Sequence, residues 1–276
     1  MHQRHAASPR ETARMTTAEL RADFLIERVF VPGHIELVYS HYDRMIIGGA
    51  MPTGEALALP NPDSLKAEYF LERRELGILN VGGAGQVLVD GTRYELGHQD
   101  CLYVGKESRE VQFSSHDAAA PAKFYLLSAP AHRVLPTTRR TQAEATPVEM
   151  GALETANRRT IYKYIYAEGI ESCQLVMGLT QLQPGSVWNT MPSHTHDRRM
   201  EAYLYFNLPA DQRVLHLMGE PHQTRPLWIA NEQAIISPPW SIHTGCGTSA
   251  YAFIWGMAGE NREYTDMDPV GIGQLQ

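Results

Sequence analysis

The stretch from Gly185 to Asn207, GSVWNTMPSHTHDRRMEAYLYFN, decides the architecture of this chain. It places His194 and His196 two residues apart, with Glu201 five residues further on. In a strand, side chains alternate between faces, so the two imidazoles point the same way, with Cα atoms roughly 7 Å apart. That separation lets both close on one ion at about 2.0–2.1 Å each. A third imidazole, His243, follows the Pro-Pro-Trp corner of PPWSIHTG.

These four residues predict a metal site whose ligands are His194, His196, Glu201 and His243. Three His and one Glu with an open position are typical of a catalytic rather than a structural metal. The spacing H-x-H-x4-E followed by a later His resembles the cupin superfamily, whose first motif supplies two His and a Glu and whose second supplies the last His. The same ligands can hold Zn, Fe, Cu or Ni, so the ligand set alone leaves the metal open.

The composition excludes several classes of partner. The chain has 276 residues, 43% of them hydrophobic and 20% charged, which is ordinary for a globular protein. Its net charge of −7 argues against nucleic acid and membrane surfaces as partners, because no basic field attracts a polyanion. No apolar run approaches membrane-spanning length. Three widely spaced cysteines without a C-x-x-C motif indicate a reducing compartment, and we expect the cytoplasm.

The remaining pattern predicts an all-β protein. From Tyr69 onward, short strand-like runs recur every 8 to 12 residues between glycine-containing turns such as Asp90-Gly91, and a second series begins near residue 158. We expect a double-stranded β-helix (bicupin) of two β-barrel lobes with a few short helices, one of them capped by Thr16 or Thr17. The expected divisions are a flexible tail (1–15), an N-terminal lobe (16–135), a linker (136–157) and a metal-binding C-terminal lobe (158–276).

The two halves also echo each other. ERRELGILNV (72–81) parallels DRRMEAYLYF (197–206), and the pattern pairs Glu75 with Glu201, 126 residues apart. On this alignment no His replaces the third histidine, and the places of the first two are taken by Glu68 and Phe70. The first lobe is therefore expected to bind no metal and to scaffold or dimerise the protein.

Longer strings carry a more specific resemblance. YFLERRELGILNVGGAG, NTMPSHTHDRRMEAYLYFN, NEQAIISPPWSIHTG and YAFIWGMAGEN resemble the bacterial 5-keto-4-deoxyuronate isomerases of pectin and uronate breakdown, and the likeness runs from about Phe24 to Met267. It implies a cytoplasmic enzyme, commonly a hexamer, that interconverts 5-keto-4-deoxyuronate and 3-deoxy-D-glycero-2,5-hexodiulosonate. It also implies one Zn²⁺ per chain, held by the matching residues His194, His196, Glu201 and His243.

A ketol isomerisation of this kind needs a group that moves a proton between neighbouring carbons and a cation for the substrate carboxylate. The sequence leaves four candidates for the proton transfer: Tyr203, Lys163, Glu232 and Glu201. Only four of the 24 basic residues are lysines, which favours bidentate recognition of a carboxylate by arginine. The candidates for this role are Arg158, Arg159, Arg198 and Arg199, of which one in each adjacent pair faces away from a barrel interior.

Two other functions stay open at this stage. One is a 5-deoxyglucuronate isomerase, also a bicupin that acts on a deoxyuronate. The other is a non-catalytic carbohydrate-binding bicupin, although such a protein has no need of an open metal site. A nicotinamide or nucleotide site is not expected, because the glycines at 82, 83 and 85 lie between two predicted strands and do not open a helix.

Overall fold

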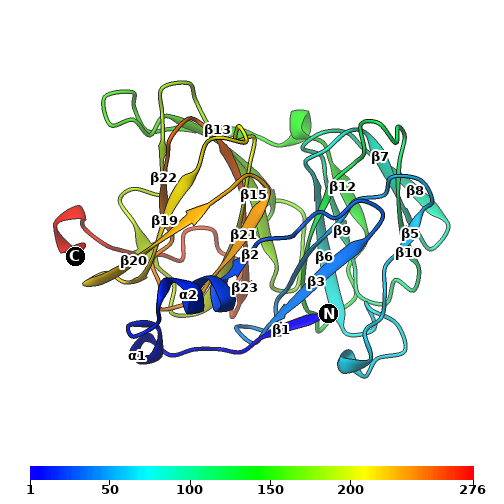
Figure 1. The fold of residues 1–276 in the computed structure, drawn as a ribbon. Helices are drawn as coiled ribbons and strands as arrows, with labels where there is room; N and C mark the ends of the chain where they lie inside the picture. The colour runs from blue at the N-terminus through cyan, green and yellow to red at the C-terminus, as the bar shows by residue number, and fades with distance from the viewer.

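The computed structural model describes the whole chain, residues 1–276, and confirms the all-β prediction. Its strands form two lobes that lie side by side in Figure 1. The α-helices are α1 (Pro9–Thr12) and α2 (Thr17–Phe24), and neither is long and apolar enough to cross a membrane. Three short 3-10 helices are η1 (Asp63–Leu65), η2 (Gln142–Glu144) and η3 (Ile272–Gln274).

The N-terminal lobe contains two sheets. The seven-stranded sheet has the order β1 (His2–Arg4), β3 (Ile35–Ser40), β4 (Ile46–Ala50), β11 (Phe124–Pro130), β6 (Arg74–Asn80), β9 (Cys101–Val104) and β12 (Thr138–Arg140). The four-stranded sheet has the order β5 (Leu57–Ala58), β10 (Val111–Ser115), β7 (Gly85–Val89) and β8 (Thr92–Leu96). The predicted hairpin turn joins β7 to β8, where Asp90 and Gly91 both take positive φ angles, as a type I′ turn requires.

The C-terminal lobe repeats this layout. Its seven-stranded sheet has the order β13 (Pro147–Met150), β14 (Arg159–Ile165), β15 (Val176–Leu182), β23 (Ala252–Gly259), β18 (Arg199–Phe206), β21 (Gln233–Ser237) and β2 (Leu25–Ile26). Its four-stranded sheet has the order β16 (Trp188–Asn189), β22 (Thr244–Gly247), β19 (Val214–Glu220) and β20 (Gln223–Ile229). A small extra ladder pairs β17 (His194–Thr195) with β24 (Asp268–Pro269).

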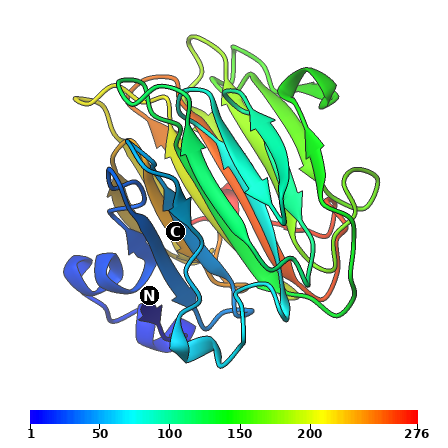
Figure 2. The same ribbon diagram turned by 90° about the vertical axis from the view of Figure 1, so that its right-hand side faces the viewer.

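The two seven-stranded sheets pack against each other and bury the main core between them. Figure 2, seen from the N-terminal lobe, shows their strands one behind the other. Leu127 of β11 and Ala202 of β18 belong to the same buried cluster, so the core spans both lobes. The approach is close: a Cβ on Gly256 of β23 would lie 2.0 Å from Leu127 Cδ1. A smaller core cluster fills the interior of the N-terminal barrel.

The predicted tail and domain boundaries differ from the structure. Residues 1–15 carry β1, which pairs in parallel with β3, and α1. The helix predicted after Thr16 is present and has Glu19 in a capping box, but it leads into β2, which pairs with β21 of the other lobe. Backbone pairing, to which the polar composition of the tail gives no clue, fixes this segment across both lobes.

The expected linker, 136–157, also contains strands. β12 extends the N-terminal sheet by pairing with β9, and β13 extends the C-terminal sheet by pairing with β14. The prolines that suggested a linker lie outside these ladders or on an edge, since Pro136 precedes β12 and Pro147 begins the edge strand β13. The connection therefore passes directly from one sheet to the next.

Candidate metal centre

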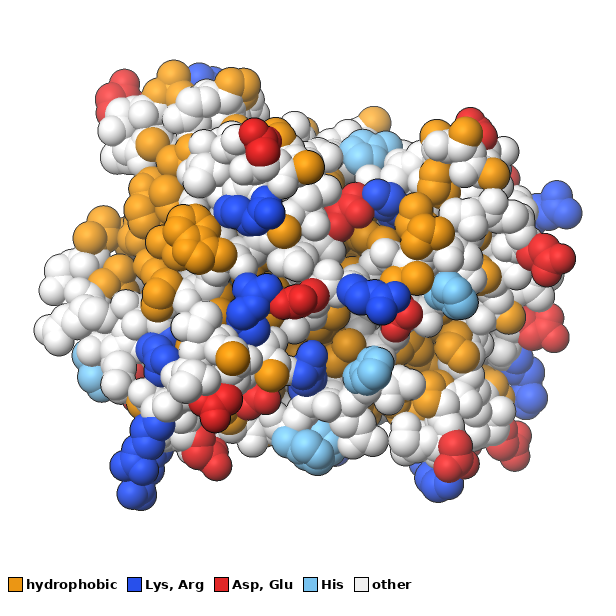
Figure 3. Space-filling view, in the orientation of Figure 1, with side chains coloured by type: hydrophobic (Ala, Val, Ile, Leu, Met, Phe, Trp, Pro, Cys, Tyr) orange, Lys and Arg blue, Asp and Glu red, His pale blue; other side chains and the backbone are white.

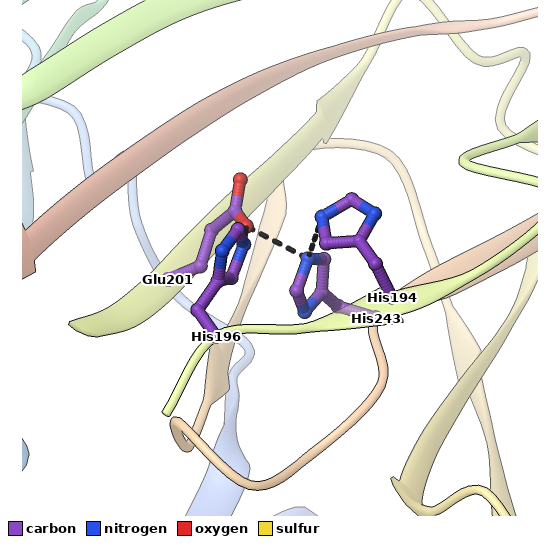
Figure 4. Close-up of side chains that lie close together, drawn as sticks. All are labelled: His194, His196, Glu201 and His243. Atoms are coloured by element: carbon purple, nitrogen blue, oxygen red, sulfur yellow. Dashed lines mark hydrogen bonds and ion pairs between the residues drawn. The ribbon is translucent and has the colours of Figure 1, made fainter. Parts of the chain in front are cut away.

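The four predicted ligands meet inside the C-terminal barrel. His194 lies on β17, Glu201 on β18, and His243 immediately before β22. Glu201 Oε2 lies 2.8 Å from His243 Nε2 and 3.0 Å from His196 Nε2, and the Nε2 atoms of His194 and His243 are 3.0 Å apart. The ligand atoms of all four side chains lie within 4.8 Å of one another, and Figure 4 shows them pointing toward one another. The spacing argument thus brings together the residues that it named.

Hydrogen bonds behind the imidazoles set which ring nitrogen faces this centre. His196 Nδ1 lies 2.7 Å from the carbonyl oxygen of Asp266, and His243 Nδ1 lies 3.3 Å from that of Ser241. A carbonyl oxygen only accepts, so each Nδ1 donates and each Nε2 keeps its lone pair. Lone pairs and a carboxylate that converge in this way fit a divalent cation between them.

Burial gives the centre its charge state. His196, Glu201 and His243 are each less than 5% exposed. Burial lowers the pKa of His194 to about 2, with His243 adding to the effect, so its imidazole is neutral at physiological pH. For Glu201, burial favours the acid form, but the nearby His243 and His196 outweigh it and hold the pKa well below its usual value. The centre therefore presents a carboxylate anion beside the neutral imidazole of His194, which suits a cation.

A cavity of about 280 Å³ opens from the ligands. Its walls are mostly apolar, with a few polar groups among them, as in sites that enclose a small ligand. The residues that complete the walls beside the ligands include Met150, Arg159, Thr180, Thr190, Tyr203, Phe253, Trp255, Tyr264 and Met267. The cavity therefore has room for a small molecule beside the four clustered side chains.

Only one of the four candidate arginines faces this cavity. Arg159 lines it, is half-buried, and donates from Nη1 to the carbonyl of Asn157 at 2.9 Å. Its neighbour Arg158 is exposed. The strand alternation that allows one arginine of each pair to face inward holds for this pair.

The other two arginines have structural partners. Arg198 pairs with Asp266 at 2.6 Å and with Asp268 at 3.2 Å. Arg199 is fully buried and donates to the carbonyl oxygens of Glu263 at 2.6 Å and Asp266 at 3.1 Å. Both hold the loop that covers the metal ligands, so neither guanidinium is directed at the cavity.

The proton-transfer candidates separate in the same way. Tyr203 lines the cavity, and its hydroxyl lies 3.2 Å from Thr190 Oγ1. Burial raises the pKa of Tyr203 well above 10, so the phenol keeps its proton. Glu201 also lines the cavity, and its Oε1 forms no hydrogen bond and is not enclosed. Lys163 does not line the cavity, and its ammonium lies over the ring of Tyr264, 5.1 Å from the centroid.

Glu232 does not lie at the site. It occupies a left-handed turn (φ 61°) before β21, and its carboxylate pairs with Lys123 of the other lobe at 2.7 Å. Ser237, which pairs with Glu201, stands five residues further along the strand, about 16 Å away at 3.3 Å per residue. The candidate acidic residue of the turn thus joins the two lobes instead of facing the cavity.

Several site residues escaped the sequence reasoning. Asp266 orients a ligand through its backbone, Thr190 contacts Tyr203, and Tyr264 and Met267 close the cavity. Three of these lie after Gly259, where the sequence has no periodicity. The one sequence feature that could have indicated this contact is the set of acidic residues in the tail, which can form ion pairs with the Arg-Arg pair at 198–199.

The first lobe shows how the repeat was misaligned. Arg74 and Arg199 begin β6 and β18, so the structural offset is 125 residues and Leu76 takes the place of Glu201. Leu76 faces the interior of the N-terminal barrel, whereas Glu75 faces the other lobe and accepts the backbone N–H of Leu175 at 2.8 Å. Moving the alignment of the two strands by one residue places each side chain on the opposite face of the sheet.

Comparisons with known proteins agree with this geometry. The model of the KduI/IolB family matches residues 25–269, which is most of the chain. The chain belongs to the KduI/IolB family. Within it, the chain is 54% identical to the 4-deoxy-L-threo-5-hexosulose-uronate ketol-isomerase of Halalkalibacterium halodurans over the full length of both. It is 56% identical to the enzyme of the same name from Formosa agariphila over 99% of this chain and 98% of that one. This KduI/IolB family member is therefore an enzyme of the isomerase class.

Solved structures support the fold. An IolB-like protein from Salmonella typhimurium superposes with a TM-score of 0.74 at 16% identity, over 90% of this chain and 96% of that one. An oxalate decarboxylase superposes with a TM-score of 0.56 at 9% identity, over 81% and 70% of the two chains. At these identities the likeness shows a shared fold and carries no statement about the reaction.

Proposed function

We propose that this protein is a zinc-dependent ketol-isomerase that interconverts 5-keto-4-deoxyuronate and 3-deoxy-D-glycero-2,5-hexodiulosonate. The observation that carries the proposal is the buried group of His194, His196, Glu201 and His243, which opens into a small closed cavity. The names of relatives that match the full chain at more than 50% identity support the same reaction. A bound Zn²⁺ would act as a Lewis acid toward the carbonyl and hydroxyl oxygens of the substrate.

Residues of the chain supply the proton chemistry. Glu201 has one carboxylate oxygen directed at the histidines, while Oε1 forms no hydrogen bond and lies beside the cavity. We assign Oε1 the transfer of the proton between the two neighbouring carbons, because no other carboxylate lines the cavity. Tyr203 stays protonated and is assigned the donation of a hydrogen bond to a substrate oxygen.

Arg159 is assigned the substrate carboxylate. It is the only arginine or lysine among the cavity walls. The net charge of −7 disfavours an anionic substrate, so its carboxylate needs a local partner. A guanidinium meets a carboxylate with two parallel hydrogen bonds, which fixes orientation as well as charge.

The decisive experiment is an assay of purified, metal-loaded protein with both sugars of the proposed equilibrium and with 5-deoxyglucuronate. Interconversion of the first pair, lost when the metal is stripped and restored by Zn²⁺, supports the proposal. Preference for 5-deoxyglucuronate identifies the alternative isomerase, and binding without turnover identifies a carbohydrate-binding protein. Activity that survives removal of the metal contradicts the role given to the centre.

The metal content is tested separately. Elemental analysis should find one Zn²⁺ per chain in the parent and in His222→Ala, since His222 is exposed and lies outside the centre. The double variant His194→Ala/His243→Ala should contain none. Two ions per chain, or full occupancy in the double variant, contradict the assignment. A cytoplasmic homo-oligomer, commonly a hexamer, remains our expectation from the family resemblance, and sedimentation of the purified protein tests its size.

A further inference from the structure

A second cavity lies in the N-terminal lobe, at the start of β6. Its volume is about 410 Å³, and its basic lining residues are Arg44, Arg73, Arg74 and His41. None of the residues that line it is acidic. None of the three arginines forms an ion pair anywhere in the chain. In a protein of net charge −7, three guanidinium groups without an ion pair at one cavity indicate a specific local arrangement and not a general excess of basic residues.

Arg74 is the buried member of this group. It is 7% exposed, and it donates only to neutral acceptors: Ser128 Oγ at 3.1 Å, the Ser128 carbonyl at 2.7 Å and the Arg44 carbonyl at 2.5 Å. Its Nη1 has no partner, yet this atom is not enclosed, so it opens to the cavity. Burial lowers the pKa of Arg74 to about 10, although Tyr39 and Glu75 act in the opposite direction. A buried cation without a counter-charge is costly.

The other lobe shows what is missing here. Arg73 and Arg74 begin β6 at the places that Arg198 and Arg199 occupy at the start of β18. In the C-terminal lobe the chain supplies its own anion, because Arg198 pairs with Asp266 at 2.6 Å. In the N-terminal lobe Arg73 donates to the backbone carbonyls of Leu65 and Lys66. The arginine pair is kept, and the carboxylate that neutralises it is not.

We propose that this cavity is a second binding site, for a small organic anion that carries a carboxylate or a phosphate. Guanidinium groups match both anions bidentately. The volume equals that of roughly 14 water molecules at about 30 Å³ each, which exceeds the volume of inorganic phosphate and suits a sugar acid or a sugar phosphate. Tyr39 and Phe70 supply apolar walls for the uncharged part. Figure 3 shows Lys, Arg and His side chains gathered near β1, whose Gln3 also lines the cavity.

The site does not depend on the metal centre or on the proposed reaction. Equilibrium dialysis of the metal-loaded, full-length protein with D-glucuronate, glucose 6-phosphate and inorganic phosphate tests it. The variant is Arg44→Asn, since Arg44 is exposed and has a φ of 53°, which asparagine tolerates. The control is Arg93→Asn, an exposed arginine of the same lobe with the same change of charge. Isomerase activity and Tm should be unchanged in both.

The parent and Arg93→Asn should bind at least one of the organic anions, and Arg44→Asn should bind it at least tenfold more weakly. Binding of D-glucuronate alone, or of glucose 6-phosphate alone, shows whether the site recognises a carboxylate or a phosphate. No binding to the parent, or equal affinity in Arg44→Asn, overturns the proposal. A change in sedimentation of Arg44→Asn without a change in anion binding also overturns it, because the cavity is then a contact between copies of the chain.

Discussion

The Nδ1 atom of His196 lies 2.7 Å from the backbone carbonyl oxygen of Asp266, seventy residues further along the chain. The side chain of Asp266 is in turn held by Arg198 at 2.6 Å and by Asn261 at 2.5 Å. The orientation of His196, one of the proposed ligands, is therefore set by a loop that an ion pair and an amide hydrogen bond hold in place. Partners of this kind fix the tautomer and the ring plane of a ligating histidine.

We predict that Asp266→Ala weakens zinc binding about tenfold. The carbonyl is retained in this variant, but the loop loses the ionic contacts that hold it against His196. Competition with a chromogenic chelator measures the change in Kd. The control is Asp211→Ala, an exposed aspartate in a turn that forms no ion pair with the rest of the chain. Equal zinc affinity in the two variants would show that the loop does not orient the histidine.

Arg159→Lys tests the contact with the substrate carboxylate. Lysine keeps the charge but loses the two parallel hydrogen bonds, so kcat/KM should fall by about tenfold or more. Arg158→Lys is the matched control, because Arg158 is exposed and adjacent. Steady-state kinetics of both variants with the deoxyuronate measure the effect. If Arg159→Lys keeps the parent kcat/KM, the carboxylate is bound elsewhere.

Tyr203→Phe removes a hydroxyl from the cavity wall while it keeps the ring. We expect kcat to fall by about 100-fold with zinc content unchanged, since one positioned hydrogen-bond donor contributes about 10²–10³ to such steps. Because burial holds the pKa of Tyr203 well above 10, its titration should not shape the pH–rate profile below pH 10. Tyr162→Phe, a half-buried tyrosine outside the cavity walls, is the control and should keep the parent kcat.

The sequence predicted which four side chains cluster but not the loop that orients them. H-x-H-x4-E is a local spacing on extended backbone, and side-chain chemistry identifies each member. The contribution of Asp266 to His196 comes from a backbone carbonyl, which every residue has, so no residue type marks it. Its position depends on the fold of the tail onto the barrel.

The misaligned repeat has a different cause. Glu75 directly follows its Arg-Arg pair, whereas Glu201 stands one residue later, so pairing the two acids shifted the alignment by one residue. In a strand the face alternates with every residue, and the structure puts Leu76 at the place of Glu201. The prediction of a flexible tail was wrong because β1 is held by backbone pairing with β3, which amino-acid composition does not reveal.

The capping box of α2 gives a pH-dependent prediction. Glu19 accepts hydrogen bonds from the backbone N–H and the hydroxyl of Thr16, which lower the pKa of its carboxyl. A folded pKa below the unfolded value stabilises the protein above the unfolded pKa, and this contribution is lost as pH falls through the folded pKa. Glu19→Gln should therefore lower Tm by about 1–2 °C at pH 7 and by less below pH 4. Glu55→Gln, exposed in a loop, should show no such difference. A Tm deficit independent of pH contradicts the assignment.

Glu75→Gln tests the contact between the lobes. The buried carboxylate of Glu75 accepts the backbone N–H groups of residues 173–175 at 2.6 to 2.9 Å and the hydroxyl of Tyr103 at 2.8 Å. An amide has one acceptor oxygen, so at least one donor between the lobes loses its partner, at a cost of about 2–3 kcal/mol. For a protein of this size, that cost corresponds to a Tm lower by about 5–10 °C.

Glu72→Gln is the matched control, because its carboxylate lies at the surface and contacts only the backbone N–H of Glu68. Differential scanning calorimetry on zinc-loaded protein measures both, and zinc content should stay at the parent value because the ligands lie in the other barrel. If the two variants have the same Tm, the carboxylate facing the second lobe contributes no stability, and the apolar core between the sheets holds the lobes together alone.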